Sequence, residues 1–322
     1  MRNALAPWLA RLLLAALLAL AFDVILWPQT PGRDALDLLA AVVGYVVLAA
    51  ALLDLIQRER VRNVIGLLAL AGLAAFAAGL LIHPRVALEN APLTILSRML
   101  GAPTAAALFA LMTWLALARG RLTFGLLLIS ALAGVTWGLY GRWLPSVVDP
   151  TAPETPLPTL LVAAAVALAL ITLFARLLRR PTATPDTLRL SPSGWAAVAL
   201  ALGGLLLLRL AQGLIDELSL VIVVSLMVFT ALILHLYRRP RDVSLLDRAL
   251  PPGPLQPALL LAAAVFVAAG VVSYNLPRAS GDADPLGLLG TLLLAFGVVW
   301  LPALSLVVGG RALIRQMRAQ PL

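Results

Sequence analysis

Apolar residues gather along this chain into long runs, separated by short segments rich in Pro, Gly and Arg. An α-helix needs about 20 consecutive apolar residues to cross the hydrocarbon core of a bilayer. Each run of about this length therefore predicts one membrane-spanning helix. We expect an all-α, polytopic transmembrane helix bundle whose ten helices span 7–27, 35–56, 63–82, 93–118, 122–141, 158–178, 194–214, 218–237, 256–275 and 286–309.

Composition agrees with a chain that is solvated by lipid. Hydrophobic residues make up 62% of it, charged residues only 12%, and its mean hydropathy is +1.00. A soluble domain carries about a quarter charged residues, and it would have to hide most of its apolar surface from water. Because the loops are too short for a soluble domain, we interpret residues 1–322 as a single transmembrane domain.

The loop 142–157 is rich in Pro and divides the chain into possible five-helix halves, 1–144 and 157–322. Halves with an odd number of helices would lie in opposite orientations, as in inverted-repeat transporters. The two halves share no convincing residue-level similarity. The inverted repeat therefore stays an open hypothesis.

Arginine alternates from loop to loop. Every basic residue is Arg, and with the N-terminus inside, the outer helix ends and loops hold only Arg33, Arg85, Arg98, Arg142, Arg209 and Arg278. The excess of basic residues on cytoplasmic loops then predicts that both termini are cytoplasmic. Arg without Lys, with abundant Ala, Leu and Pro, suggests a GC-rich bacterial genome, so we expect a multi-pass protein of the bacterial inner (plasma) membrane.

Several chemistries are excluded or disfavoured. The chain has no Lys for a retinal Schiff base and no Cys for thiolate metal sites or iron–sulfur clusters. His83 and His235 end helices on opposite sides, so they cannot share a metal or haem, and we expect each to be solvated or interfacial. No run has a carboxylate near its centre, which disfavours pumps and ion channels. We therefore predict no catalytic residue, metal or cofactor, and the scattered arginines predict no nucleic-acid partner.

Polar residues at the outer ends of three helices form the candidate site. Asp23, Arg98 and Arg209 each lie within about two turns of the outer surface. Gln212 and Asp216 follow Arg209 at i+3 and i+7 and share its helical face. Arginine pairs with phosphate or carboxylate, so these residues predict a binding site for an anionic head group. The alternatives are an internal ion pair, or arginines that snorkel to the surface.

Two patterns predict how the helices are anchored and packed. Five tryptophans lie near predicted helix ends and resemble an interfacial aromatic belt: Trp8, Trp27, Trp114, Trp143 and Trp195. Gly134 and Gly138 form a G-x-x-x-G pair, which allows close helix contact in lipid.

The segment 242–250 predicts a short helix at the inner interface. Its apolar residues share one helical face, and we expect Leu246 and Leu250 to face lipid or protein.

No catalytic motif is present, so function rests on the helix pattern alone. We expect a non-catalytic membrane subunit that packs in a larger complex, with membrane lipids and other membrane protein subunits as partners. The first alternative is a carrier or flippase for a lipid or an amphipathic anionic solute. The second is a membrane enzyme that acts on a lipid-linked substrate at the outer leaflet.

Overall fold

The computed structural model describes residues 2–28, 33–92, 94–118, 123–148, 154–178, 185–238, 243–247, 256–276 and 285–319. Its regular structure is entirely helical over these residues. Within these described ranges, ten helices are long and apolar enough to cross a membrane, which confirms the predicted number and fits a multi-pass membrane protein.

The elements follow one another with short connections. Their bounds are α1 Arg2–Ala19, η1 Leu20–Leu26, α2 Ala35–Arg58, α3 Val64–Leu81, α4 Pro84–Ala87, η2 Leu96–Gly101, α5 Ala102–Ala118, α6 Phe124–Val148, α7 Leu157–Leu177, η3 Pro185–Leu188, α8 Pro192–Ala211, α9 Glu217–Tyr237, α10 Gln256–Tyr274 and α11 Pro285–Ala319. The π-helical segments η1 and η2 continue into α1 and α5 as single spans. We call the end of the bundle where α1 begins the N-terminal face, and the opposite end the distal face.

Capping motifs end α8 and begin α9. Gly213 adopts a φ of +66° that favours glycine, and the Leu214 N–H donates to the Arg209 carbonyl, as in a Schellman motif. The Asp216 carboxylate then accepts from the Ser219 N–H at the start of α9. The prediction of two separate helices here is confirmed.

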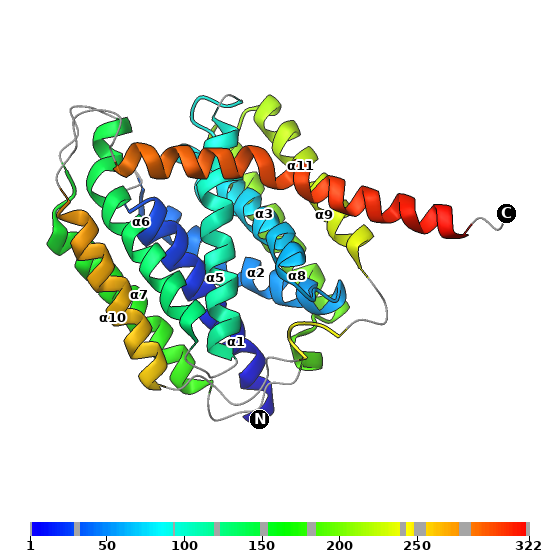
Figure 1. The fold of residues 1–322 in the computed structure, drawn as a ribbon, viewed down its shortest axis with the longest axis horizontal. Helices are drawn as coiled ribbons and strands as arrows, with labels where there is room; N and C mark the ends of the chain where they lie inside the picture. The colour runs from blue at the N-terminus through cyan, green and yellow to red at the C-terminus, as the bar shows by residue number, and fades with distance from the viewer. Residues whose placement is uncertain are drawn as a thin grey trace.

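The first four spans form the centre of the bundle. We compare the share of buried residues in the most apolar 18-residue stretch of each span. This share is 78% in the span formed by α1 with η1 and in α3, and 67% in α2 and in the span formed by η2 with α5. The corresponding share is 22% in α7 and 17% in α8. Figure 1 shows α6, α7 and α10 on one flank of this centre and α9 on the other, with α11 running across the bundle.

Helices of the two predicted halves pack against each other. The contacting pairs include α1 with α7, α2 with α8, α3 with α9 and α6 with α10. The tightest approach is between α6 and α10, where a Cβ on Gly134 would lie 2.2 Å from the Phe266 carbonyl oxygen. A Cβ on Gly138 would lie 2.2 Å from the Gly270 carbonyl oxygen. The predicted packing role of this glycine pair is confirmed.

The backbone near Pro103 is stabilised by side chains from within the bundle. Pro103 has no N–H to donate to the preceding turn. The Thr104 hydroxyl donates to the Met99 carbonyl at 3.1 Å instead. The Trp300 indole N–H of α11 donates to the Leu100 carbonyl at 2.8 Å. These bonds matter because a bilayer offers no water to pair with a free backbone group.

The aromatic-belt prediction is wrong for two of the five tryptophans. Trp27 and Trp114 are buried, and the Trp114 indole donates to a backbone carbonyl of α1 at 3.0 Å. Trp8 is 52% exposed, as a belt residue would be, and Trp195 is partly exposed. The side chain of Trp143 lies outside the described residues. An indole packs equally well in a core when its N–H finds an acceptor, so position near a helix end does not decide its environment.

The predicted interfacial helix at 242–250 is wrong for its described part, 243–247. Residues 245–247 form a turn, in which the Asp247 carboxylate accepts from the Ser244 N–H at 2.9 Å. This local hydrogen bond competes with helix formation. Leu246 is fully buried in the protein, and Leu250 lies outside the described residues.

Candidate functional site

The polar residues of the distal face surround His83, which follows α3 and lies outside the membrane-spanning segments. Its side chain is 1% exposed, so the expectation of a solvated or interfacial histidine is wrong. The ring lies 4.6 Å from that of Trp27 and 6.4 Å from that of Phe22. His83 Nε2 forms a 2.7 Å hydrogen bond with the Tyr45 hydroxyl. Residues at the end of the first span and in α2 thus enclose one imidazole.

Asp23 lies on the same side of His83. Its carboxylate is 2.5 Å from the Arg33 guanidinium and 3.4 Å from His83 Nε2. Asp23 belongs to η1, whose π-helical turns are often found at functional sites. The sequence predicts Arg98 and Arg209 as the charges that complement Asp23, and the structure pairs Asp23 with Arg33 instead.

Arg209 is almost fully buried, and its Nη2 has no hydrogen-bond partner. Its guanidinium pairs with the Asp37 carboxylate, donates to the Leu81 carbonyl at 2.9 Å and donates to the Gln212 side-chain oxygen at 2.8 Å. Arg85 lies 3.6 Å from the same Asp37 carboxylate. Arg209 therefore joins α8 to α2 and to the end of α3.

Asp37 is the residue that sequence reasoning missed. It lies in the first turn of α2, where a carboxylate commonly complements the helix dipole and attracts no further notice. Its depth below the distal end of α2 was nevertheless readable from the sequence. A search for carboxylates at the depth of Arg209 would have found it.

Not all predicted site residues come together. Arg98 donates to the Val86 carbonyl at 2.9 Å and lies 2.5 Å from the Glu89 carboxylate, away from the contacts of Arg209. Asp216 caps α9. Asp23, Arg209 and Gln212 belong to the group around His83, which we call the distal cluster and define as Asp23, Arg33, Asp37, Tyr45, His83, Arg85, Arg209 and Gln212.

The distal cluster has little room for a ligand. The cavity beside His83 and Arg209 has a volume of about 10 Å³, which is about the size of one water molecule. No group of three His, Asp or Glu side chains suited to a metal ion occurs among the described residues. This geometry therefore favours the internal ion pair over the predicted head-group site.

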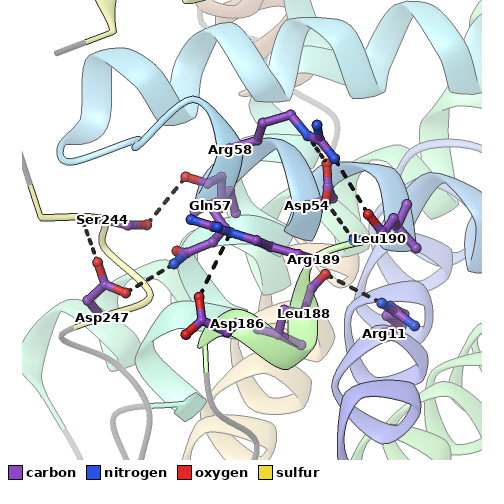
Figure 2. A network of polar contacts seen from close by, with 11 residues as sticks. Arg11, Asp54, Gln57, Arg58, Asp186, Leu188, Arg189, Leu190, Ser244 and Asp247 are labelled. Atoms are coloured by element: carbon purple, nitrogen blue, oxygen red, sulfur yellow. Dashed lines mark hydrogen bonds and ion pairs between the residues drawn. The ribbon is translucent and has the colours of Figure 1, made fainter. Parts of the chain in front are cut away.

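A second polar cluster lies on the N-terminal face and is drawn in Figure 2. The Asp54 carboxylate of α2 is fully buried. It accepts from the Leu190 N–H at 2.7 Å, from the Trp195 indole at 3.0 Å and from Arg58 Nε at 2.9 Å. One carboxylate thus fixes the start of α8 against the end of α2.

The same network reaches two further segments. Arg11 of α1 donates to the Leu188 carbonyl at 3.4 Å. Gln57 donates to the Asp247 carboxylate at 3.2 Å, which ties the turn at 245–247 to α2 (Figure 2). Both contacts join parts of this one chain, so the network has a structural role.

Comparison of the chain with known protein families, with curated proteins and with solved structures gives no match.

The first prediction concerns the Arg209–Asp37 pair. Arg209→Leu leaves the Asp37 carboxylate without its closest partner, and loss of one partner of a buried pair costs about 3–5 kcal/mol. We expect a loss of that order in the free energy of unfolding, measured by SDS titration in mixed micelles. The double variant Arg209→Leu/Asp37→Leu should recover part of it, and Arg189→Leu, at an exposed pair, should lose less than about 1 kcal/mol. An Arg209→Leu protein as stable as the wild type would contradict this role.

The second prediction concerns pH. Burial lowers the pKa of His83 from 6.5 to about 4; Asp23 opposes this shift, and Arg33 and Arg209 add to it. Between these pH values the unfolded chain binds a proton that the folded chain does not. Stability should therefore fall as the pH drops from about 6.5 towards 4, and this group should contribute no pH dependence above that window.

Thermal unfolding in detergent between pH 7 and pH 4.5 measures the effect. The His83→Gln variant keeps a polar side chain but does not titrate, so the difference between its slope and that of the wild type isolates His83. Equal slopes for the two proteins would show that His83 is not the group responsible.

Proposed function

We propose that the protein is a non-catalytic integral membrane subunit that packs against other membrane proteins through α8, the least buried helix of its second half. The unequal burial of the two halves carries this proposal. The most apolar windows of the first four spans are at least 67% buried, whereas those of α7 to α11 are at most 33% buried. The central helices are already packed as in a complete bundle, and the others keep long apolar faces.

The weakest packing is that of α8. Within it only Val198, Leu205 and Arg209 are buried, and they form a single narrow stripe. Gly203 and Gly204 have open space where a Cβ would stand. Small residues on a bare helix face suit a close helix–helix contact in lipid, where packing rather than hydrophobicity drives association.

The polar groups also support a subunit. The buried carboxylates of both clusters pair with arginines or backbone groups of the same chain. The carrier remains the alternative function, but equivalent halves of an inverted-repeat carrier would be packed alike, and these are not. No observation favours the enzyme.

Gentle extraction followed by native mass spectrometry tests the proposal. We expect a partner in fixed stoichiometry that is lost in Gly203→Leu, since the new side chain would occupy the contact face. Gly290→Leu on α11 is the matched control, because its added side chain also meets open space and should leave the partner bound. Purification of the wild type as a lone chain, with transport activity in vesicles, would favour the carrier.

We propose that the N-terminal face is cytoplasmic and that the membrane is the bacterial inner membrane. The support is the alternation of arginine-rich and arginine-poor segments along the chain. The Cys-free background allows a direct test with single cysteines on exposed residues. An impermeant maleimide should label Asn275→Cys, on the distal face, in intact cells. It should label Ser193→Cys, on the N-terminal face, only after permeabilisation, and the reverse pattern would refute the orientation.

A further inference from the structure

A cavity separate from the distal cluster lies on the N-terminal face, between α3, α5 and α6. Its volume is about 420 Å³, within the range of about 300–1,000 Å³ common for ligand sites. Apolar side chains dominate its lining: Leu67 of α3, Met112 and Leu115 of α5, and Ile129 of α6. Asn63 is one of its few polar residues. A hydrocarbon chain fits such walls better than a polar solute.

A basic rim adjoins this cavity. Asn63 Nδ2 donates to the Tyr237 hydroxyl at 2.7 Å. The guanidinium of Arg62 lies 5.4 Å from the centre of the Tyr237 ring, and that of Arg311 lies 5.3 Å from it. Two cations therefore lie against the ring of Tyr237, and the hydroxyl of this tyrosine is hydrogen-bonded to Asn63, which lines the cavity.

The rim also has hydrogen-bonding capacity that the protein does not use. Arg311 Nη1 is buried and has no hydrogen-bond partner. A buried donor left unpaired is costly, and a phosphate oxygen is the acceptor that a guanidinium binds best. The distal cluster also has a buried donor without a partner, Arg209 Nη2, but there the guanidinium is paired with the Asp37 carboxylate and the adjoining cavity measures only about 10 Å³.

We propose that the N-terminal face binds one anionic membrane lipid, with an acyl chain in the cavity and its phosphate against Arg62 and Arg311. Charge complementarity selects the head group, and apolar burial retains the tail. The site is independent of the proposed subunit function, because it uses α3, α5, α6 and the rim rather than the bare face of α8.

The test uses purified, delipidated full-length protein and native mass spectrometry. Phosphatidylglycerol and phosphatidylcholine with identical acyl chains are the probes. We expect one phosphatidylglycerol per chain, bound at least about tenfold more tightly than phosphatidylcholine, as one charge-assisted contact would give. Arg311→Gln should remove this preference, and Arg62→Gln tests the head-group contact independently of Arg311. Arg189→Gln, an exposed arginine of the same face, should bind like the wild type.

The tail contact has its own variant. Ile129→Trp should fill the cavity and weaken binding of both lipids at least about tenfold. Leu128→Trp is the control, because the neighbouring Leu128 is exposed and its ring would face the bilayer. Equal affinity for the two lipids in the wild type would overturn the head-group assignment. Unchanged binding in Ile129→Trp would overturn the cavity assignment and would mean that only annular lipid is bound.

Discussion

The fold depends on one constraint: inside a bilayer, every charge and every backbone polar group needs a partner within the protein. Arg209 shows the result. Its pairing with Asp37 and with the Leu81 carbonyl attaches α8, the least buried span, to the packed centre of the bundle. Asp54 does the same on the opposite face, where it accepts from Leu190 and Trp195. Apolar contact alone would hold α8 weakly, because lipid tails are as apolar as the helix face they replace.

The same constraint separates the two ends of the molecule by role. At the distal face, the cluster pairs its buried charges internally, and the space beside it measures about 10 Å³. At the N-terminal face, the cavity beside Asn63 measures about 420 Å³, and the guanidinium groups of Arg62 and Arg311 both lie against the Tyr237 ring beside it. A cluster whose charges are already paired stabilises the fold. An apolar cavity with a basic rim is instead suited to bind an amphipathic anion. The unequal burial of the halves adds a third feature, a lightly packed second half, on which the proposed subunit function rests.

The candidate site was partly readable from sequence. Depth from the helix ends marked Asp23 and Arg209, and helical spacing placed Gln212 beside Arg209, which the 2.8 Å hydrogen bond confirms. Arg98 has the same depth, but it contacts Glu89 and Val86 instead. The distance of a residue from the helix end gives its position along the membrane normal. It does not determine the direction in which the side chain points around the helix axis. Rotation about the helix axis depends on packing between helices, and that information is spread over the whole bundle.

The sequence by itself determined the all-helical class and the number of spans, because the length and apolarity of each run are local properties set by bilayer thickness. The helix ends were less well determined, since α6 and α11 continue to Val148 and Ala319, beyond the predicted ends at residues 141 and 309. The sequence also located the close packing of α6 at Gly134 and Gly138. Only the tertiary structure decided which helices form the centre, that His83 and Trp114 are buried, and that Asp37 is the partner of Arg209. In a chain this apolar, a helix face that meets protein has the same composition as one that meets lipid. The sequence pattern therefore does not distinguish buried from lipid-facing residues, and only the packing of the helices against one another does.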